Sequence, residues 1–150
     1  MRSSIVAIAL SGGVTLAWPA AGAAEMLISE TEAKLPASTD VGMTTRGLTR
    51  GPGVEQVSPD PNRGVTSPLP LKIKFIARNN VAIDPDSVKV VYLKAQNVDL
   101  TDRIKKYLTP DGIDMAKAEI PPGTHQLRIN LRDKNGRTST ATLKLTVAPK

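Results

Sequence analysis

Polar and apolar side chains alternate most clearly near the C-terminal end of the sequence. Between residues 125 and 132, one parity of the chain holds His125, Leu127, Ile129 and Leu131, and the other holds Gln126, Arg128, Asn130 and Arg132. Residues 140–147 alternate in the same way. An Asn-Gly pair at 135–136, between the two runs, favours a type I′ turn. The pattern predicts a two-stranded hairpin with one buried face.

Earlier runs are also typical of strands. Apolar residues occupy every second position from 69 to 77, and Asn79-Asn80 then turns the chain. The run SVKVVYLK at 87–94 is rich in β-branched residues, and 113–120 forms a shorter, weaker run. With turn residues recurring at intervals of about ten positions, the region 53–150 predicts an all-β, immunoglobulin-like antiparallel sandwich of about seven strands.

One short helical insert interrupts this β pattern. In DLTDRIKKYL, residues 99–108, the apolar residues Leu100, Ile104 and Leu108 are spaced so that they share one face of a helix. Asp99 is placed to cap the helix, because aspartate favours the N-cap position. The sequence therefore predicts one or two helical turns at 99–108.

The first 24 residues have the layout of a secretory signal peptide. Arg2 gives a positive start, residues 5–18 are mostly apolar, and a proline and small residues lead to Ala23 and Ala24. A transmembrane anchor is the alternative, but the run is shorter than the roughly 20 apolar residues that a spanning helix requires. We expect cleavage after Ala23 or Ala24, export to the periplasm or the medium, and a flexible leader over 25–52 before the folded domain.

Composition narrows the chemistry. The chain has 150 residues and no cysteine, which excludes disulfides and thiolate metal sites. Outside the predicted signal peptide only Phe75, Tyr92 and Tyr107 are aromatic, too few for a surface that stacks sugars or bases. Residues 65–150 carry 15 basic and 8 acidic side chains, a net charge of +7, which favours acidic partners.

A family resemblance rests on two stretches of the sequence. IDPDSVKV at 83–90 and PPGTHQLRINLRDKNGR at 121–137 resemble the bacterial immunoglobulin-like domains of envelope and secreted proteins. In those domains an I-D-P-x-S-V strand entry and a P-G-x-H-x-L strand leading to D-x-x-G recur. The resemblance covers about residues 53–149 and implies a spacer, scaffold or interaction module with no catalytic residues. The insert at 99–108 departs from the plainest members and is a place where an individual function could reside.

His125 is the only histidine, so it is the only candidate base for a serine nucleophile. Its position at the start of a strand, on the inward parity and beside a turn, favours a structural role in which it satisfies backbone groups. One histidine and no cysteine also disfavour a zinc or copper site. We therefore expect no catalytic residue, no cofactor and no transition-metal site.

Acidic side chains cluster at predicted loops. Asp84 and Asp86 form one pair, and Asp99 and Asp102 form another, which leaves a calcium site open. The simpler expectation is that these residues initiate turns, cap the helix and form the hairpin corner at Asp133. A glycosidase carboxylate pair is disfavoured because the aromatic residues of a sugar cleft are missing.

Basic side chains offer the best candidate for a binding surface. By strand parity, five of them point outward and predict a partner-binding basic face: Lys72, Lys74, Arg128, Arg132 and Lys144. The insert and hairpin tip add Arg103, Lys105, Lys106, Lys134 and Arg137. An ordinary solvated surface is the alternative. The export signal disfavours nucleic acid and favours an anionic envelope component or an acidic protein.

These observations favour a non-catalytic, exported binding or scaffolding module of the bacterial cell envelope. The first alternative is a basic domain that docks on an anionic surface or an acidic protein partner. The second is a small hydrolase or metal-dependent protein that uses His125.

Overall fold

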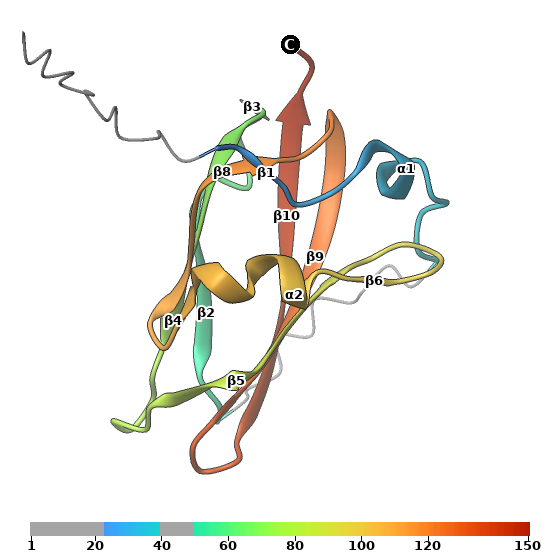
Figure 1. The fold of residues 1–150 in the computed structure, drawn as a ribbon. Coiled ribbons are helices and arrows are strands. Elements are labelled where there is room, and N and C mark those ends of the chain that lie inside the picture. Colours follow the sequence, from blue (N-terminus) through green and yellow to red (C-terminus); the bar gives the residue numbers. More distant parts are fainter. Residues whose placement is uncertain (1–22, 40–49) are drawn as a thin grey trace, which may run out of the picture.

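The computed structural model describes residues 23–39 and 50–150, which form a two-layer β-sandwich (Figure 1). The strands are β1 (Glu25–Met26), β2 (Gly53–Ser58), β3 (Val65–Thr66), β4 (Leu69–Ile76), β5 (Ile83–Tyr92), β6 (Val98–Asp99), β7 (Leu108–Thr109), β8 (Gly112–Glu119), β9 (Gly123–Asp133) and β10 (Thr138–Ala148). The helices are α1 (Glu30–Ala33), α2 (Thr101–Ile104) and the 3-10 turn η1 (Lys105–Tyr107). Residues 1–22 of the predicted signal peptide and residues 40–49 of the predicted leader lie outside this description.

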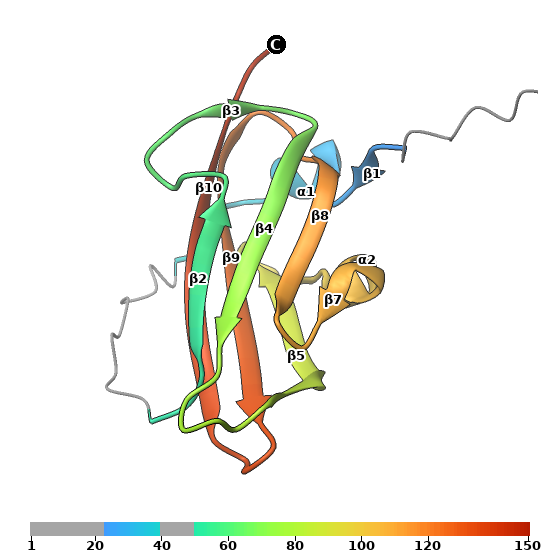
Figure 2. The same cartoon turned by 90° about the vertical axis from the view of Figure 1, so that its left-hand side faces the viewer.

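The strands form two sheets that face each other across the core (Figure 2). One sheet has the order β1-β8-β4-β2, with β7 also paired to β8, and the other has the order β3-β10-β9-β5-β6. The predicted all-β sandwich is confirmed at this level. The prediction of a purely antiparallel sandwich is wrong, because β1 runs parallel to β8 and β3 runs parallel to β10. Both parallel partners are two-residue strands at sheet edges, too short to produce a periodic signal in the sequence.

Alternation of burial along the long strands builds the core. In β4 the residues Leu69, Leu71, Ile73 and Phe75 are at most 5% exposed, whereas the residues between them are exposed. The apolar parity of β9 is buried in the same way, with Ile129 fully inaccessible. Each such side chain contributes about 1.5–3 kcal/mol when it leaves water. The predicted period-2 pattern and its inward faces are thus confirmed in these strands.

The turn between β9 and β10 differs from the type I′ turn that its sequence favours. Gly136 has φ +82°, but Asn135 is not in the left-handed region that a type I′ turn requires at both central residues. Instead, the carboxylate of Asp133 accepts the N–H groups of Asn135 and Arg137, both at 2.9 Å. This side chain holds a three-residue loop with glycine in the left-handed position. Asn79 and Asn80, with φ of +55° and +57°, form the turn with both central residues left-handed.

The predicted flexible leader needs correction for its described part. Residues 25–38, which we call the strap, pack on the sandwich: β1 pairs with β8, and Leu27 and Ile28 are 0% and 2% exposed. In α1 the Ser29 hydroxyl accepts the Glu32 N–H, and the Glu32 carboxylate accepts the Ser29 N–H, which completes a capping box. The strap therefore belongs to the folded domain.

The helical insert is present at the predicted place and is short. Leu100 and Ile104 are buried in the core, and Leu108 packs against it. Leu100 occupies the N-cap position, and Asp99, one residue earlier than a cap, accepts the Thr101 N–H at 2.8 Å. Within the described residues, no helix has the length and apolar character needed to cross a bilayer.

Candidate functional site

His125 is buried in the sandwich and both of its ring nitrogens are engaged. Nε2 lies 2.7 Å from the Pro121 carbonyl oxygen, and because a carbonyl only accepts, Nε2 carries the proton. Nδ1 then accepts the hydroxyl of Tyr92 at 2.8 Å. This geometry matches the predicted structural role, with a backbone group as one partner. While both ring nitrogens are hydrogen-bonded in this way, neither is available to accept a proton from a nucleophile.

Burial sets the protonation behaviour of this pair. The pKa of His125 is lowered chiefly because the charged imidazolium would lose its hydration, an effect to which the nearby Lys94 charge adds. Burial also raises the pKa of Tyr92 to about 12, and the charge of Glu32 contributes in the same direction. Both groups are therefore neutral near pH 7, as a hydroxyl donor and an imidazole acceptor should be.

Asp133 takes the local role that the sequence predicts and forms the hairpin corner. The predictions for Asp84 and Asp99 are wrong: Asp84 accepts the Asp86 N–H at 3.1 Å inside strand β5 and not in a loop, and Asp99 precedes the N-cap residue Leu100. Hydrogen bonds from Thr101 lower the pKa of Asp99. Across residues 23–39 and 50–150, no three acidic or histidine side chains are grouped to hold a metal ion.

The predicted basic face is divided by the fold. Lys72 and Lys74 lie on β4 in one sheet, whereas Arg128 and Arg132 lie on β9 and Lys144 on β10 in the other sheet. Outward side chains of two packed sheets point in opposite directions. The single face is therefore corrected to two separate sets on opposite sides of the sandwich.

The two lysines of β4 stand among acidic neighbours. Lys72 Nζ lies 3.5 Å from the Asp114 carboxylate, and Lys74 is paired across the ladder with Glu55 on β2. A hollow of about 490 Å³ lies over this part of the sheet, lined by side chains of both charge signs that include Asp111. Alternating charges leave this side without a net positive field.

On the other sheet the basic residues accumulate. The ladder sets Lys144 opposite Gln126, and Arg128 between Val91 and Thr142. Lys89 on β5 joins this outward side and was missed at the sequence level. The alternation of side chains along a strand identifies it. Val88 and Val90, its neighbours in the run SVKVVYLK, are both buried, so Lys89 must point outward.

The cations of the insert hold the strap. Arg103 forms a two-pronged ion pair with Glu32, with contacts of 2.9 and 2.7 Å, and its Nη1 also donates to the Leu27 carbonyl at 2.8 Å. This arrangement lowers the pKa of Glu32 from 4.5 to about 2. Lys106 and the Tyr107 hydroxyl both bind the Glu25 carboxylate. The insert, expected to be a place for an individual function, is thus an intramolecular anchor.

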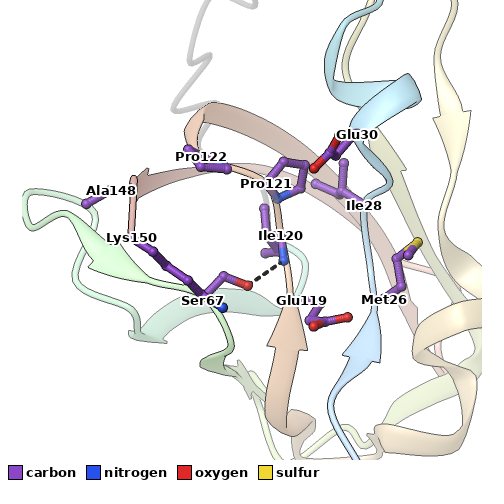
Figure 3. Close-up of a pocket in the computed structure, with 10 residues that line it drawn as sticks. All are labelled: Met26, Ile28, Glu30, Ser67, Glu119, Ile120, Pro121, Pro122, Ala148 and Lys150. Carbon is purple, nitrogen blue, oxygen red and sulfur yellow. Dashed lines mark hydrogen bonds between the residues drawn. The ribbon is translucent and has the colours of Figure 1, made fainter.

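A second hollow, of about 330 Å³, lies where the strap meets the loop between β8 and β9 (Figure 3). Met26, Ile28 and Pro121 supply apolar walls, and Glu119 and Lys150 supply charges of opposite sign. The hydrogen bond from His125 to Pro121 fixes one wall of the hollow. The space is suited to the apolar part of a small molecule or a peptide side chain.

No protein-family model, curated protein or solved structure matches this chain.

Proposed function

We propose that this chain is an exported, non-catalytic binding or scaffolding domain of the bacterial cell envelope, with an immunoglobulin-like fold. The strand order supports the fold: β8-β4-β2 and β10-β9-β5 correspond to strands E-B-A and G-F-C of an immunoglobulin sandwich. The motif at 83–90 lies on β5, and the motif at 121–137 runs through β9 into its turn. The position of strand D is taken by β1 of the strap.

The outward side of β5, β9 and β10 is the single observation that carries the binding function. These are the longest strands, at 10, 11 and 11 residues, so they hold their side chains in a rigid array. Lys89, Gln126 and Lys144 are exposed there. A polar array on a rigid sheet can bind a partner without a conformational change.

The environment of His125 supports the non-catalytic part of the proposal. Its two nitrogens stabilise the start of β9 through Pro121 and Tyr92, and the ring is only 3% exposed. A base for acyl transfer needs an accessible nitrogen beside a nucleophile. These hydrogen bonds explain why a histidine occupies this position without assigning it a catalytic role.

Export is tested by the mass of the mature protein. Cleavage after Ala23 or Ala24 leaves β1 complete, because that strand begins at Glu25. We expect the protein in the periplasm or medium with an N-terminus at Ala24 or Glu25, as measured by intact mass spectrometry. A cytoplasmic protein that keeps Met1 would contradict the export proposal.

Binding is tested by site-specific photo-cross-linking in cells. A photoreactive residue at Gln126, on the outward side of β9, is compared with one at Ala116, an exposed position on β8 of the other sheet. We expect one recurrent cross-linked product from position 126 and none from position 116. Charge reversal of Arg128, Arg132 and Lys144 to glutamate should abolish the product, whereas reversal of Lys72 and Lys74 should not. Equal or absent cross-linking from both positions would overturn the assignment of this face.

A further inference from the structure

Three cations on the proposed binding side fall on one diagonal of the sheet. Lys89 on β5 is opposite Asn130 on β9, Arg128 is two residues along β9 from Asn130, and Lys144 on β10 is opposite Gln126, two residues further. Each step therefore crosses one strand and advances two residues. Diagonal neighbours of this kind lie about 7–8 Å apart in a sheet. We call Lys89, Arg128 and Lys144 the basic stripe.

Two acidic side chains lie beside the basic stripe. At one end, Asp84 lies 3.5 Å from Arg132 and neutralises the fourth cation of this side. Beside Lys89, Asp99 on β6 is opposite Val91, and the Lys89 charge contributes to the lowered pKa of Asp99. These two carboxylates lie near the Lys89 end of the basic stripe, beside Arg132 and along β6.

Hydroxyls and amides flank the basic stripe, together with the half-buried Val91 opposite Arg128. Thr142 is opposite Arg128, Gln126 is opposite Lys144, and Asn130 accepts a hydrogen bond from the Thr140 hydroxyl at 2.8 Å. The large apolar side chains that are exposed in the described residues, Met26, Val57 and Ile76, belong to β1, β2 and β4 of the other sheet. Such a surface can bind charged and hydroxylated groups and has no side chain to insert into lipid.

We propose that the basic stripe binds a linear anionic polysaccharide, held by its acidic groups rather than by ring stacking. This inference rests on the proposed binding function and names the partner of the same face. A line of three regularly spaced cations fits a chain of repeating acidic groups better than it fits a membrane, which attracts broad basic patches. The flanking hydroxyls and amides can hydrogen-bond sugar hydroxyls.

The test uses the mature chain and polygalacturonate, a linear carboxylated polysaccharide, as the probe. The stripe variant carries Lys89→Gln, Arg128→Gln and Lys144→Gln. The matched control carries Lys72→Gln, Lys74→Gln and Lys117→Gln, three exposed lysines of the other sheet, and has the same net charge. We expect the wild-type affinity to fall steeply with salt, because binding releases the counterions of the polymer. The stripe variant should lose about tenfold or more in affinity with a shallower salt slope, and the control should stay within about twofold.

Several outcomes would overturn the inference. Equal losses in both triple variants would mean that only net charge matters, and stronger binding to phosphatidylglycerol vesicles than to the polymer would assign the stripe to lipid. Absence of polymer binding, with the cross-link at position 126 retained, would refute the polysaccharide and keep the binding function, with an acidic protein as the partner. Loss of both would refute the two proposals together. Single variants Lys89→Gln and Lys144→Gln, checked by their thermal midpoints, separate lost binding from lost folding.

Discussion

The strap at the N-terminal end and the β9–β10 hairpin at the C-terminal end are attached to the same sandwich by different physical means. The hairpin is held by ten paired positions and by a continuous buried face, all from neighbouring parts of the chain. The strap is held by the two paired positions of β1, an isolated bridge between Ala37 and Lys94, two buried side chains, and side-chain contacts with residues 71 to 82 positions away. The comparison indicates that the hairpin is part of the cooperative core, whereas the strap can detach as a local unit.

The largest expected effect comes from the hairpin. Ile129→Ala removes three carbons from a site with 0% exposure at the centre of β9, and we expect the free energy of unfolding to fall by about 2–5 kcal/mol. Urea unfolding measures this change. Replacement of Gln126, an exposed residue of the same strand, by alanine is the control and should change the free energy of unfolding by less than about 0.5 kcal/mol. A small effect of Ile129→Ala would show that β9 is not in the cooperative core.

A matched truncation in the strap sharpens the comparison. Leu27 is also 0% exposed. Its truncation can lower the free energy of unfolding by no more than the free energy that docks the strap, because beyond that limit the strap detaches and the sandwich stays folded. We expect Leu27→Ala to lower global stability less than Ile129→Ala. Hydrogen exchange should accelerate selectively at the amides of Leu27 and Ile28, which donate to Glu119. Uniform acceleration over β9 and β10 would show that the strap and the core unfold together.

The same contrast explains which parts of the fold the sequence predicts. Period-2 alternation in β4, β9 and β10 is local, so it appears in the sequence and is confirmed. The strap has no such period: its Leu27 and Ile28 are adjacent and both are buried directly after β1, where their N–H groups donate to the Glu119 carbonyl. In the sequence, Arg103 and Lys106 look like solvated surface cations. Their roles as anchors of the strap depend on Glu32 and Glu25, which only the folded chain brings close to them.

The candidate site follows the same rule. Outward parity correctly identifies the individual basic side chains, but it does not say which sheet each strand joins, so Lys72 and Lys74 were grouped with residues of the opposite side. The diagonal order of Lys89, Arg128 and Lys144 depends on the register between β5, β9 and β10. Register is set by pairing across the sheet, which a single strand sequence does not contain.

A smaller effect is expected from the ion pair that anchors the strap. Glu32→Gln and Arg103→Met, alone and combined, form a double-mutant cycle, for which we expect a coupling of about 1 kcal/mol because the side chains are 18% and 36% exposed. The pKa of Glu32 is about 2 in the folded chain against 4.5 without its partners. Its contribution is therefore complete above pH 4.5 and is lost as the pH falls from 4.5 towards 2. A coupling near zero would show that Leu27 and Ile28 alone hold the strap.

The smallest effect concerns the hairpin, in a different pH range. Burial lowers the pKa of His125 below 6.5, so acidification below pH 6.5 protonates the unfolded chain before the folded one. The free energy of unfolding should therefore decrease as the pH falls from 6.5, well above the range in which Glu32 acts. Urea unfolding at several pH values should show this slope in the wild type and in Glu32→Gln, and lose it in His125→Gln. An unchanged slope in His125→Gln would show that another group titrates there, and would separate the acid sensitivity of the hairpin from its one buried imidazole.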